Sequence, residues 1–196
     1  MATESGFIRH CLDGHSHVCL GALPNELMPS ADQFNGIWNL RPEEYPTHRI
    51  HGRMVKLPRW QKAYGNDYRF SGLTSVALPV GRELVPFLSW AVQTIDHRLN
   101  GILMNWYDGS LGHYIGKHRD SRDGLIEGAP IISMSLGETR ICRFRKWKGL
   151  EQVDIAVSHG SVLIIPFDTN LSWTHEITKS KRAQGRRISI TIRAFH

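Results

Sequence analysis

The sequence RISITIR, residues 187–193, alternates strictly between polar and apolar side chains. With the two-residue period of a β-strand, its three isoleucines take one face. The polar residues of the other face are Arg187, Ser189, Thr191 and Arg193. Two arginines, a serine and a threonine cannot pack unpaired against an apolar core. That face therefore either meets solvent or binds an anion, and a carboxylate would suit the planar guanidinium groups.

Short apolar segments separated by turn residues fill the chain from residue 101 onward. We expect strands at 102–107, 131–136, 139–145, 152–157, 161–167 and 187–195. The clearest helix precedes them, at 83–95 and continuing to about Leu99. Apolar residues repeat there at three- and four-residue steps, and Pro86 suits a first helical turn. A helical segment followed by runs of short strands predicts a mainly β domain of the α+β class, an antiparallel sandwich or barrel with helices on one side.

Residues 1–49 give weaker signals, because glycine, proline, asparagine and aspartate interrupt short apolar pieces. Ser30 is expected to cap a helix, and residues 53–57 are expected to form a strand that Pro58 ends. A patch rich in histidine and cysteine comprises His10, Cys11, His15, His17 and Cys19. Its spacing matches no zinc-finger template, so a loop with incidental histidines is favoured over a zinc site.

A candidate metal site begins with His118 and Asp120, in the sequence HRD. Residues two apart on an extended backbone leave the same face. An imidazole and a carboxylate on one face are two of the three ligands of a facial triad for non-haem Fe(II). An HxD pair alone is a weak sign, and His175 supplies a candidate third ligand. The competing histidines, His113 and His159, are interpreted as structural or surface residues, because neither lies two residues from a carboxylate.

Length and composition predict one ordinary globular domain of 196 residues, with 41% hydrophobic and 21% charged residues. No apolar run approaches the ~20 residues that cross a bilayer, and the N-terminus has no signal-peptide pattern. We therefore expect a protein of the cytoplasm, or of the nucleus in a eukaryote, that is not secreted and binds no membrane. The net charge of +6 indicates either a polyanionic partner such as nucleic acid or a solvated basic face.

Together these segments resemble the AlkB family of Fe(II)/2-oxoglutarate dioxygenases, and most of all its homologue-2 branch and similar bacterial enzymes. The resemblance covers roughly residues 50–195. The motifs that carry it are PRWQ at 58–61, YG at 64–65, YRFSGL at 68–73, Asn105-x-Tyr107, HRD at 118–120, PI at 130–131, FR at 144–145, His175 and the closing RxSxTxR. The family pattern closes RxNxTxR, so Ser189 stands where asparagine is usual.

This resemblance implies a double-stranded β-helix, or jelly-roll, with flanking N-terminal helices. It implies a single AlkB-like dioxygenase domain over 1–196, with a nucleotide-recognition-like region at 50–82 and a metal and 2-oxoglutarate core at 101–196. By the same resemblance, Fe(II) is bound by the catalytic residues His118, Asp120 and His175, and 2-oxoglutarate and O2 take the remaining coordination positions. The residues it assigns to 2-oxoglutarate are Asn105, Tyr107, Arg187, Thr191 and Arg193. Which arginine takes which carboxylate stays open.

The activity that the resemblance implies is oxidative dealkylation of N-alkylated nucleobases by a monomer, in DNA more than in RNA, as in repair. The substrate residues it implies are His51, Arg59, Tyr68, Phe70, Ser121 and Arg122. A flipped base would stack on Phe70, with the ring of His118 on its other side. The residues implied for the nucleic-acid backbone are Lys179, Lys181 and Arg182. Without the resemblance, the aromatic residues are equally explained as core and the basic run as a solvated loop.

Two departures from the family concern the substrate. His51 stands where a family enzyme carries an intercalating phenylalanine, and Arg122 stands where family repair enzymes carry a carboxylate. Arg122 could point inward and disfavour a cationic base, or outward to a phosphate with Asp123 supplying the carboxylate. Two other functions stay open: the same chemistry on a small molecule or free nucleotide, and a catalytically inactive nucleic-acid-binding module, against which the intact triad argues.

Overall fold

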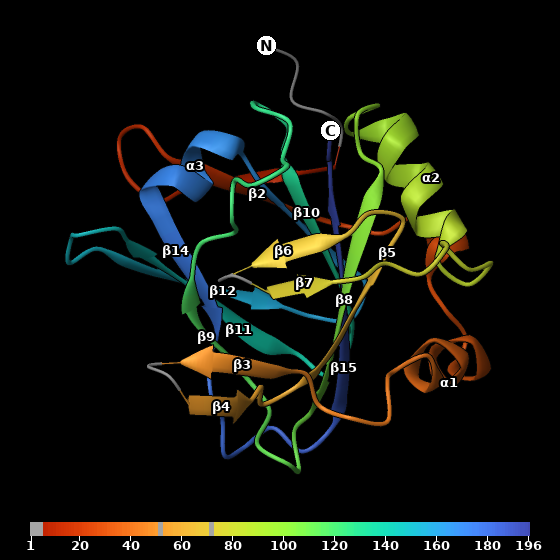
Figure 1. Cartoon of the computed structure of the whole chain (residues 1–196). Helices are drawn as coiled ribbons and strands as arrows, with labels where there is room; N and C mark the ends of the chain where they lie inside the picture. The colour runs from red at the N-terminus through yellow and green to blue at the C-terminus, as the bar shows by residue number, and fades with distance from the viewer. Residues whose placement is uncertain (1–5, 51–52, 71–72) are drawn as a thin grey trace.

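Two antiparallel β-sheets face each other and form the body of the protein (Figure 1). The computed structural model describes residues 6–50, 53–70 and 73–196. The larger sheet has the order β1-β2-β13-β10-β15-β8-β5 and the smaller one β12-β11-β14-β9. The bounds in the larger sheet are β1 Ile8–Cys11, β2 His17–Ala22, β13 Ser161–Ile165, β10 Ile131–Gly137, β15 Arg186–Arg193, β8 Gly101–Asp108 and β5 Trp60–Tyr64. Those in the smaller are β12 Gln152–Val157, β11 Arg140–Lys146, β14 Trp173–Ile177 and β9 Ile115–His118. The predicted jelly-roll is confirmed.

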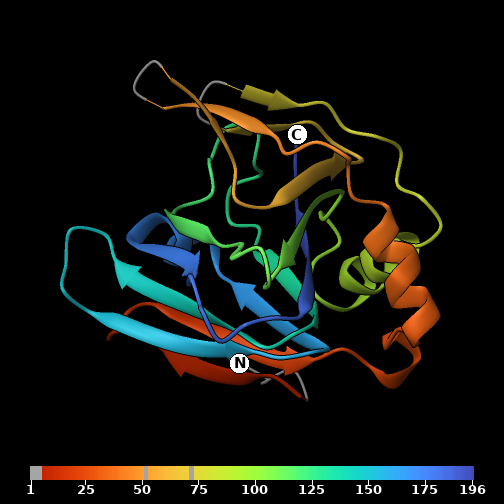
Figure 2. The same cartoon turned by 90° about the horizontal axis from the view of Figure 1, so that it is seen from below.

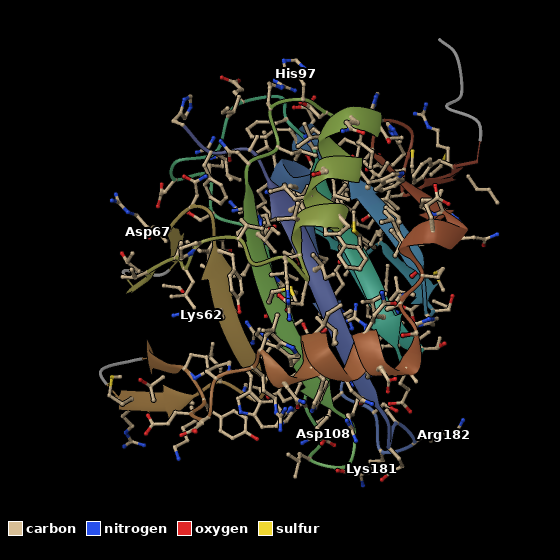
Figure 3. All side chains as sticks on the ribbon, turned by 90° about the vertical axis from the view of Figure 1, so that its right-hand side faces the viewer. Lys62, Asp67, His97, Asp108, Lys181 and Arg182 are labelled. Carbon is tan, nitrogen blue, oxygen red and sulfur yellow. The ribbon has the colours of Figure 1, made fainter. Side chains whose placement is uncertain are left out.

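Helices α1 (Ala31–Asn39) and α2 (Val85–Thr94) cover the outer face of the larger sheet (Figure 3). The three isoleucines of β15 and Met104 and Trp106 of β8 are buried there against Trp38 of α1 and Phe87 of α2. The indole Nε1 of Trp106 donates to the carbonyl oxygen of Ile37 at 3.0 Å, which ties α1 to the sheet. The apolar face of the alternating strand is thus core, as its period predicts.

The opposite face of β15 points into the space between the two sheets. Its four polar residues are all buried, with exposed fractions of 1% for Arg187, 4% for Ser189, 8% for Thr191 and 4% for Arg193. Tyr107, Ile131 and Leu163 line the same cavity as these polar residues and belong to a second apolar cluster that joins the sheets. The solvent alternative for this face is therefore wrong, and the anion alternative remains.

Helix α1 begins where the sequence predicts. Ser30 accepts a hydrogen bond from the backbone N–H of Gln33, whose side chain accepts one from the N–H of Ser30. Helix α2 has Pro86 in its first turn as expected, but it ends at Thr94 and not near Leu99. The reason is local: the Asp96 carboxylate accepts from both the backbone and the guanidinium of Arg98, which closes a turn in place of the helix.

The histidine- and cysteine-rich patch is a β-hairpin and not the expected loop. His10 and Cys11 lie on β1, and His17 and Cys19 lie on β2. The carboxylate of Asp13 accepts from two backbone N–H groups in the turn between them. Strand β2 pairs with β13, a partner far along the chain that local periodicity does not reveal. Among the described residues the patch brings no three ligand groups close enough for a metal.

The connecting segments differ from the prediction in further ways. Strand β13 ends at Ile165 and not at residue 167, because Pro166 lacks the N–H that a ladder needs and precedes the short helix α3 (Phe167–Ser172). A 3₁₀ turn, η1, spans Asn25–Leu27. Two hairpins stand apart from the sheets, β3 (Thr47–Ile50) with β4 (Arg53–Lys56), which was expected at 53–57, and β6 (Tyr68–Phe70) with β7 (Leu73–Ser75).

These two hairpins lie on the side of the molecule opposite the N-terminal hairpin β1–β2 (Figure 2). No helix in the described part of the chain combines the length and the apolar character that crossing a membrane requires.

We predict that Ser30→Ala lowers the free energy of unfolding by about 1 kcal/mol, because the first turn of α1 loses its cap. Chemical denaturation would measure the change. Ser30→Asp is the matched control, since its carboxylate can still accept from the same N–H and should keep stability near the parental value. Equal stability of the alanine variant and the parent would contradict the importance of this cap.

Candidate metal and co-substrate site

Three side chains that the sequence singles out meet between the sheets. His118 ends β9 and lies opposite His175 of β14 in the antiparallel register, with ring centroids 4.3 Å apart. Asp120 follows two residues later. One ligand atom from each of His118, Asp120 and His175 lies within 4.8 Å of the others. Two imidazoles and one carboxylate in this arrangement suit the facial triad that holds Fe(II) and leaves positions open.

The carboxylate of Asp120 is oriented by a buried arginine. Both Nε and Nη2 of Arg193 donate to its Oδ2, at 3.0 and 2.7 Å. The other oxygen, Oδ1, lies 3.9 Å from Nε2 of His118. Burial alone would raise the pKa of Asp120, but Arg193 and the two histidines lower it to about 2. The carboxylate is therefore ionised at neutral pH, as a metal ligand must be.

Both histidines are held neutral. Burial, and then the neighbouring His175, lower the pKa of His118 to about 3, and burial lowers the pKa of His175. The ring Nδ1 of His118 lies 2.9 Å from the carbonyl oxygen of Gly116, which can only accept, so Nδ1 carries the proton. The Nε2 lone pair of His118 is then free to bind a cation, as a hydrogen bond at the far nitrogen favours.

His118, Asp120 and His175 form a triangle of possible metal ligands. A pocket of about 290 Å³ opens beside this triangle and reaches between the sheets to Arg187. Its polar lining includes all three triangle residues and Asn105, Tyr107, Arg187, Ser189, Thr191 and Arg193. Every residue that the resemblance assigns to 2-oxoglutarate therefore faces one cavity. Apolar walls from Ile131, Leu163, Ile165 and Ile177 surround them.

The guanidinium of Arg187 has more donors than partners. Its Nη2 donates to Oγ of Ser135 at 2.8 Å, and the ring of Tyr107 lies 5.0 Å away. No described residue accepts from its Nε or Nη1, although both atoms are buried. An unpaired buried charge is costly. Two open N–H groups on a planar cation match one end of a dicarboxylate, so this residue fits 2-oxoglutarate.

Three further polar pairs support the lining, and two of the residues in them, Gln61 and Ser133, were not expected at the site. Asn105 accepts from Nε of Arg59 at 2.8 Å, and Gln61 accepts from Nη2 of the same guanidinium at 2.9 Å. The hydroxyl of Ser189, at the position usually held by asparagine, lies 3.1 Å from the hydroxyl of Ser133. Strand pairing brings Gln61 and Ser133 to the site, and their spacing in the sequence does not predict this position.

The expected substrate residues are only partly placed. Tyr68 and Arg59 line the pocket, and the Tyr68 hydroxyl donates to Oδ1 of Asp120 at 3.4 Å. His51 and the side chain of Phe70 lie outside the described residues. Arg122 is exposed and is not among the residues that line the pocket, which agrees with its outward alternative. Ser121 is half-buried, and its hydroxyl accepts from the N–H of Asp123.

The competing histidines both bond to the backbone. Nδ1 of His113 accepts from the N–H of Asp108, and its Nε2 lies 3.0 Å from the hydroxyl of Tyr45. Nδ1 of His159 accepts from the N–H of Gly137. These bonds fit the structural interpretation of both residues.

The basic residues Lys179, Lys181 and Arg182 are exposed on the loop between β14 and β15. Figure 3 shows Lys181 and Arg182 at one end of the molecule, beside Asp108. Nζ of Lys179 lies 5.7 Å from the ring centroid of Tyr114, a residue of the pocket wall. The loop therefore borders the pocket through Lys179.

Comparison with known proteins identifies the family. The model of the 2OG-Fe(II) oxygenase superfamily matches residues 26–193. The chain belongs to this superfamily. Members are enzymes that use Fe(II) and 2-oxoglutarate, which agrees with the triangle and the pocket described above. The predicted family resemblance and fold are confirmed.

Named relatives agree with this. The mouse DNA oxidative demethylase ALKBH2 is 32% identical over 156 residues, which are 74% of this chain and 65% of that protein. The rat alpha-ketoglutarate-dependent dioxygenase alkB homolog 3 is 27% identical over 71% of this chain and 50% of its own length. The chain thus spans between half and two thirds of the length of these relatives. The solved structure of OsALKBH1 shares the fold with a TM-score of 0.57 and 16% identity, covering 95% of this chain and 100% of that one.

We predict that Cys142, which lines the pocket, is not alkylated by iodoacetamide at pH 8 in the native protein. Burial raises the pKa of its thiol to about 12, so the reactive thiolate does not form at pH 8. The exposed Cys11 is the internal control and should be modified. Peptide mass spectrometry measures both sites, and denaturant should make Cys142 react. Equal labelling of both cysteines in the native protein would show that this thiol is not shielded.

Proposed function

We propose that this chain is an Fe(II)/2-oxoglutarate-dependent dioxygenase that removes N-alkyl groups from nucleobases, in DNA more than in RNA. The observation that carries the proposal is the single pocket shared by the triangle of His118, Asp120 and His175 and the incompletely paired guanidinium of Arg187. One end of this pocket suits a divalent cation and the other suits a carboxylate.

In this proposal Fe(II) is bound by Nε2 of His118, by Oδ1 of Asp120 and by His175. Arg193 keeps Oδ2 of Asp120 occupied, so we assign the metal to Oδ1, which otherwise accepts only the long hydrogen bond from the Tyr68 hydroxyl at 3.4 Å among the contacts described above. Iron, once bound, supplies the redox chemistry that couples O2 to the decarboxylation of 2-oxoglutarate. The protein contributes a pocket between two apolar clusters, where the binding groups are fixed before either ligand arrives.

For 2-oxoglutarate we propose Arg187, with Asn105, Tyr107, Thr191 and Arg193 as further contacts. Arg187 lines the pocket, is 1% exposed and offers two unpaired N–H groups, so it suits the carboxylate remote from the metal. Arg193 already bonds to Asp120 and retains only Nη1 without a partner among the described residues. The two arginines are therefore assigned different parts: Arg187 binds the co-substrate, and Arg193 connects it to the metal ligand.

A nucleic-acid substrate is supported by three features. The chain carries a net charge of +6, an exposed basic loop borders the pocket, and relatives are named as DNA oxidative demethylases. Five residues between 57 and 68 line the pocket from the proposed recognition region: Leu57, Pro58, Arg59, Gln61 and Tyr68. Turnover of a panel of methylated oligonucleotides and nucleosides, with products identified by mass spectrometry, tests the proposal. Turnover of nucleosides alone would favour a small-molecule enzyme.

We predict that His175→Ala abolishes succinate formation from 2-oxoglutarate, because the metal loses one of three protein ligands. Circular dichroism checks that the variant is folded. His97→Ala is the matched control, since His97 is exposed beyond the end of α2, away from the pocket (Figure 3). A folded His175→Ala variant that forms succinate at the parental rate would disprove the metal assignment.

We predict that Arg187→Lys raises the KM for 2-oxoglutarate by about tenfold or more, because a hydrogen bond to a charged group is worth about 1.5–3 kcal/mol and lysine lacks the planar fork. The neighbouring Arg186→Lys is the control. Arg186 is exposed and donates to Oδ1 of Asn35, outside the pocket. Steady-state kinetics measures the KM for 2-oxoglutarate of both variants, and an unchanged KM in Arg187→Lys would exclude the assigned role.

We predict that replacing Lys181 and Arg182 together by alanine weakens DNA binding at low salt. If each side chain contacts one phosphate, the slope of log affinity against log salt should fall by about 2. The control replaces Arg9 and Arg82 by alanine, which removes the same charge from exposed positions on β1 and before α2. Fluorescence anisotropy measures both slopes. If the two double variants lose affinity equally, only net charge matters and the loop has no specific role.

A further inference from the structure

The six-residue helix α3 joins three distant segments of the chain. The Thr169 hydroxyl donates to the carbonyl oxygen of His17 on β2 at 2.8 Å. The carbonyl oxygen of Leu171 accepts from Nη1 of Arg119 at 2.7 Å, and that of Ser172 accepts from the N–H of Trp147 at 2.8 Å. Between these contacts Asn170, which is 1% exposed, reaches the backbone of Asp120. A short helix is thus a junction beside the proposed metal site.

Asp120 lies where the sheet no longer holds the chain. Strand β9 ends at His118, so register with β14 fixes His118 opposite His175 but does not extend to Asp120. The N–H of Asp120 donates to Oδ1 of Asn170 at 3.0 Å, and its carbonyl oxygen accepts from Nδ2 of Asn170 at 3.1 Å. One primary amide therefore provides the acceptor and the donor that a neighbouring strand would provide.

This contact also relates two of the three proposed ligands to each other. Asn170 lies five residues before His175, within α3, and α3 leads directly into β14 (Figure 1). Arg193 orients the carboxylate of Asp120 through its side chain, whereas Asn170 fixes the backbone from which that side chain departs. Position and orientation of the carboxylate are thus set by two different residues on two different elements.

We propose that Asn170 is a positioning residue for the metal, holding the backbone of Asp120 at the distance from His175 that a divalent cation requires. This inference rests on the proposed function, since it assumes that Asp120 is a ligand. Residues that orient metal ligands without touching the metal typically change metal affinity 10–100-fold when they are replaced.

The amide of Asn170 is difficult to replace. Aspartate has nearly the same shape and could still accept from the N–H of Asp120, but it would lose the donor to the carbonyl oxygen. It would also bring an unpaired charge into a buried site, which is costly. Thr169→Val is the matched control at the adjacent position, because it removes both bonds to the backbone of His17 and leaves both bonds of Asn170 to Asp120 in place.

The experiment titrates the full chain with Co(II) under anaerobic conditions and records the dissociation constant and the visible absorption bands of the bound ion. For Asn170→Asp we expect affinity about 10–100-fold weaker and altered bands, while Thr169→Val stays close to the parent in both. Thermal unfolding of the metal-free variants separates an effect on the site from an effect on stability. An Asn170→Asp variant that binds Co(II) with parental affinity and parental bands would overturn the proposal.

A second measurement needs no variant. In the metal-free parent, hydrogen exchange at the Asp120 amide should be slow, because that N–H is bonded to a buried side chain. Exchange at the rate of an unstructured peptide would also overturn the proposal, even if Asn170→Asp did not fold. If hydrogen exchange at the Asp120 amide is slow but the parent binds no Co(II), the proposed metal site is refuted, and with it the positioning role of Asn170.

Discussion

The buried ion pair between Arg193 and Asp120 is the contact on which the site depends. Asp120 is 4% exposed and so is Arg193, and neither charge could remain at this depth alone. Removing one partner of such a pair typically costs about 3–5 kcal/mol, because the other is left uncompensated. Arg193 ends β15 in the larger sheet, and Asp120 lies on the segment that follows β9 of the smaller sheet, so the pair joins the two. It therefore fixes the distance between the sheets at the place where the proposed metal ligands meet.

The second buried arginine of β15, Arg187, differs from Arg193 because no carboxylate of the described residues pairs with it. Arg187 stands six residues before Arg193 on the same strand face, between the same two sheets. A serine hydroxyl and an aromatic ring partly satisfy it, and no described carboxylate balances its charge. One strand thus carries Arg193, whose charge Asp120 neutralises, and Arg187, whose charge no carboxylate of the described residues neutralises. In the proposed function, the first arginine orients a metal ligand and the second binds the dicarboxylate.

Much of this arrangement follows from local sequence, and what does not follow has a physical reason. The alternation of residues 187–193 gave the correct strand and both of its faces, because the two-residue period depends on backbone geometry alone. The cap at Ser30 and the first turn with Pro86 were equally local. The hairpin β1–β2 was missed because its stability comes from pairing with β13, about 140 positions away along the chain. The end of α2 was missed because one Asp96–Arg98 contact competes with an otherwise continuous apolar stripe.

Of the proposed metal ligands, all three were identifiable as residues, but the groups that hold them were not. Asn170 and Ser135 look like ordinary polar residues in the sequence, and only the fold brings them to Asp120 and Arg187. The RxSxTxR pattern identified both arginines but did not distinguish their roles, because the roles depend on which arginine contacts Asp120.

The same unpaired groups that suit ligand binding also limit the stability of the ligand-free chain. Two N–H groups of Arg187 and Nδ1 of His175 are buried without a hydrogen-bond partner among the described residues. A ligand that pairs with these atoms in the folded chain alone shifts the folding equilibrium in proportion to the logarithm of its concentration. Metal, co-substrate and fold are therefore linked through a few buried polar atoms. The apolar clusters on either side of β15 supply the folding free energy that lets those atoms stay unpaired.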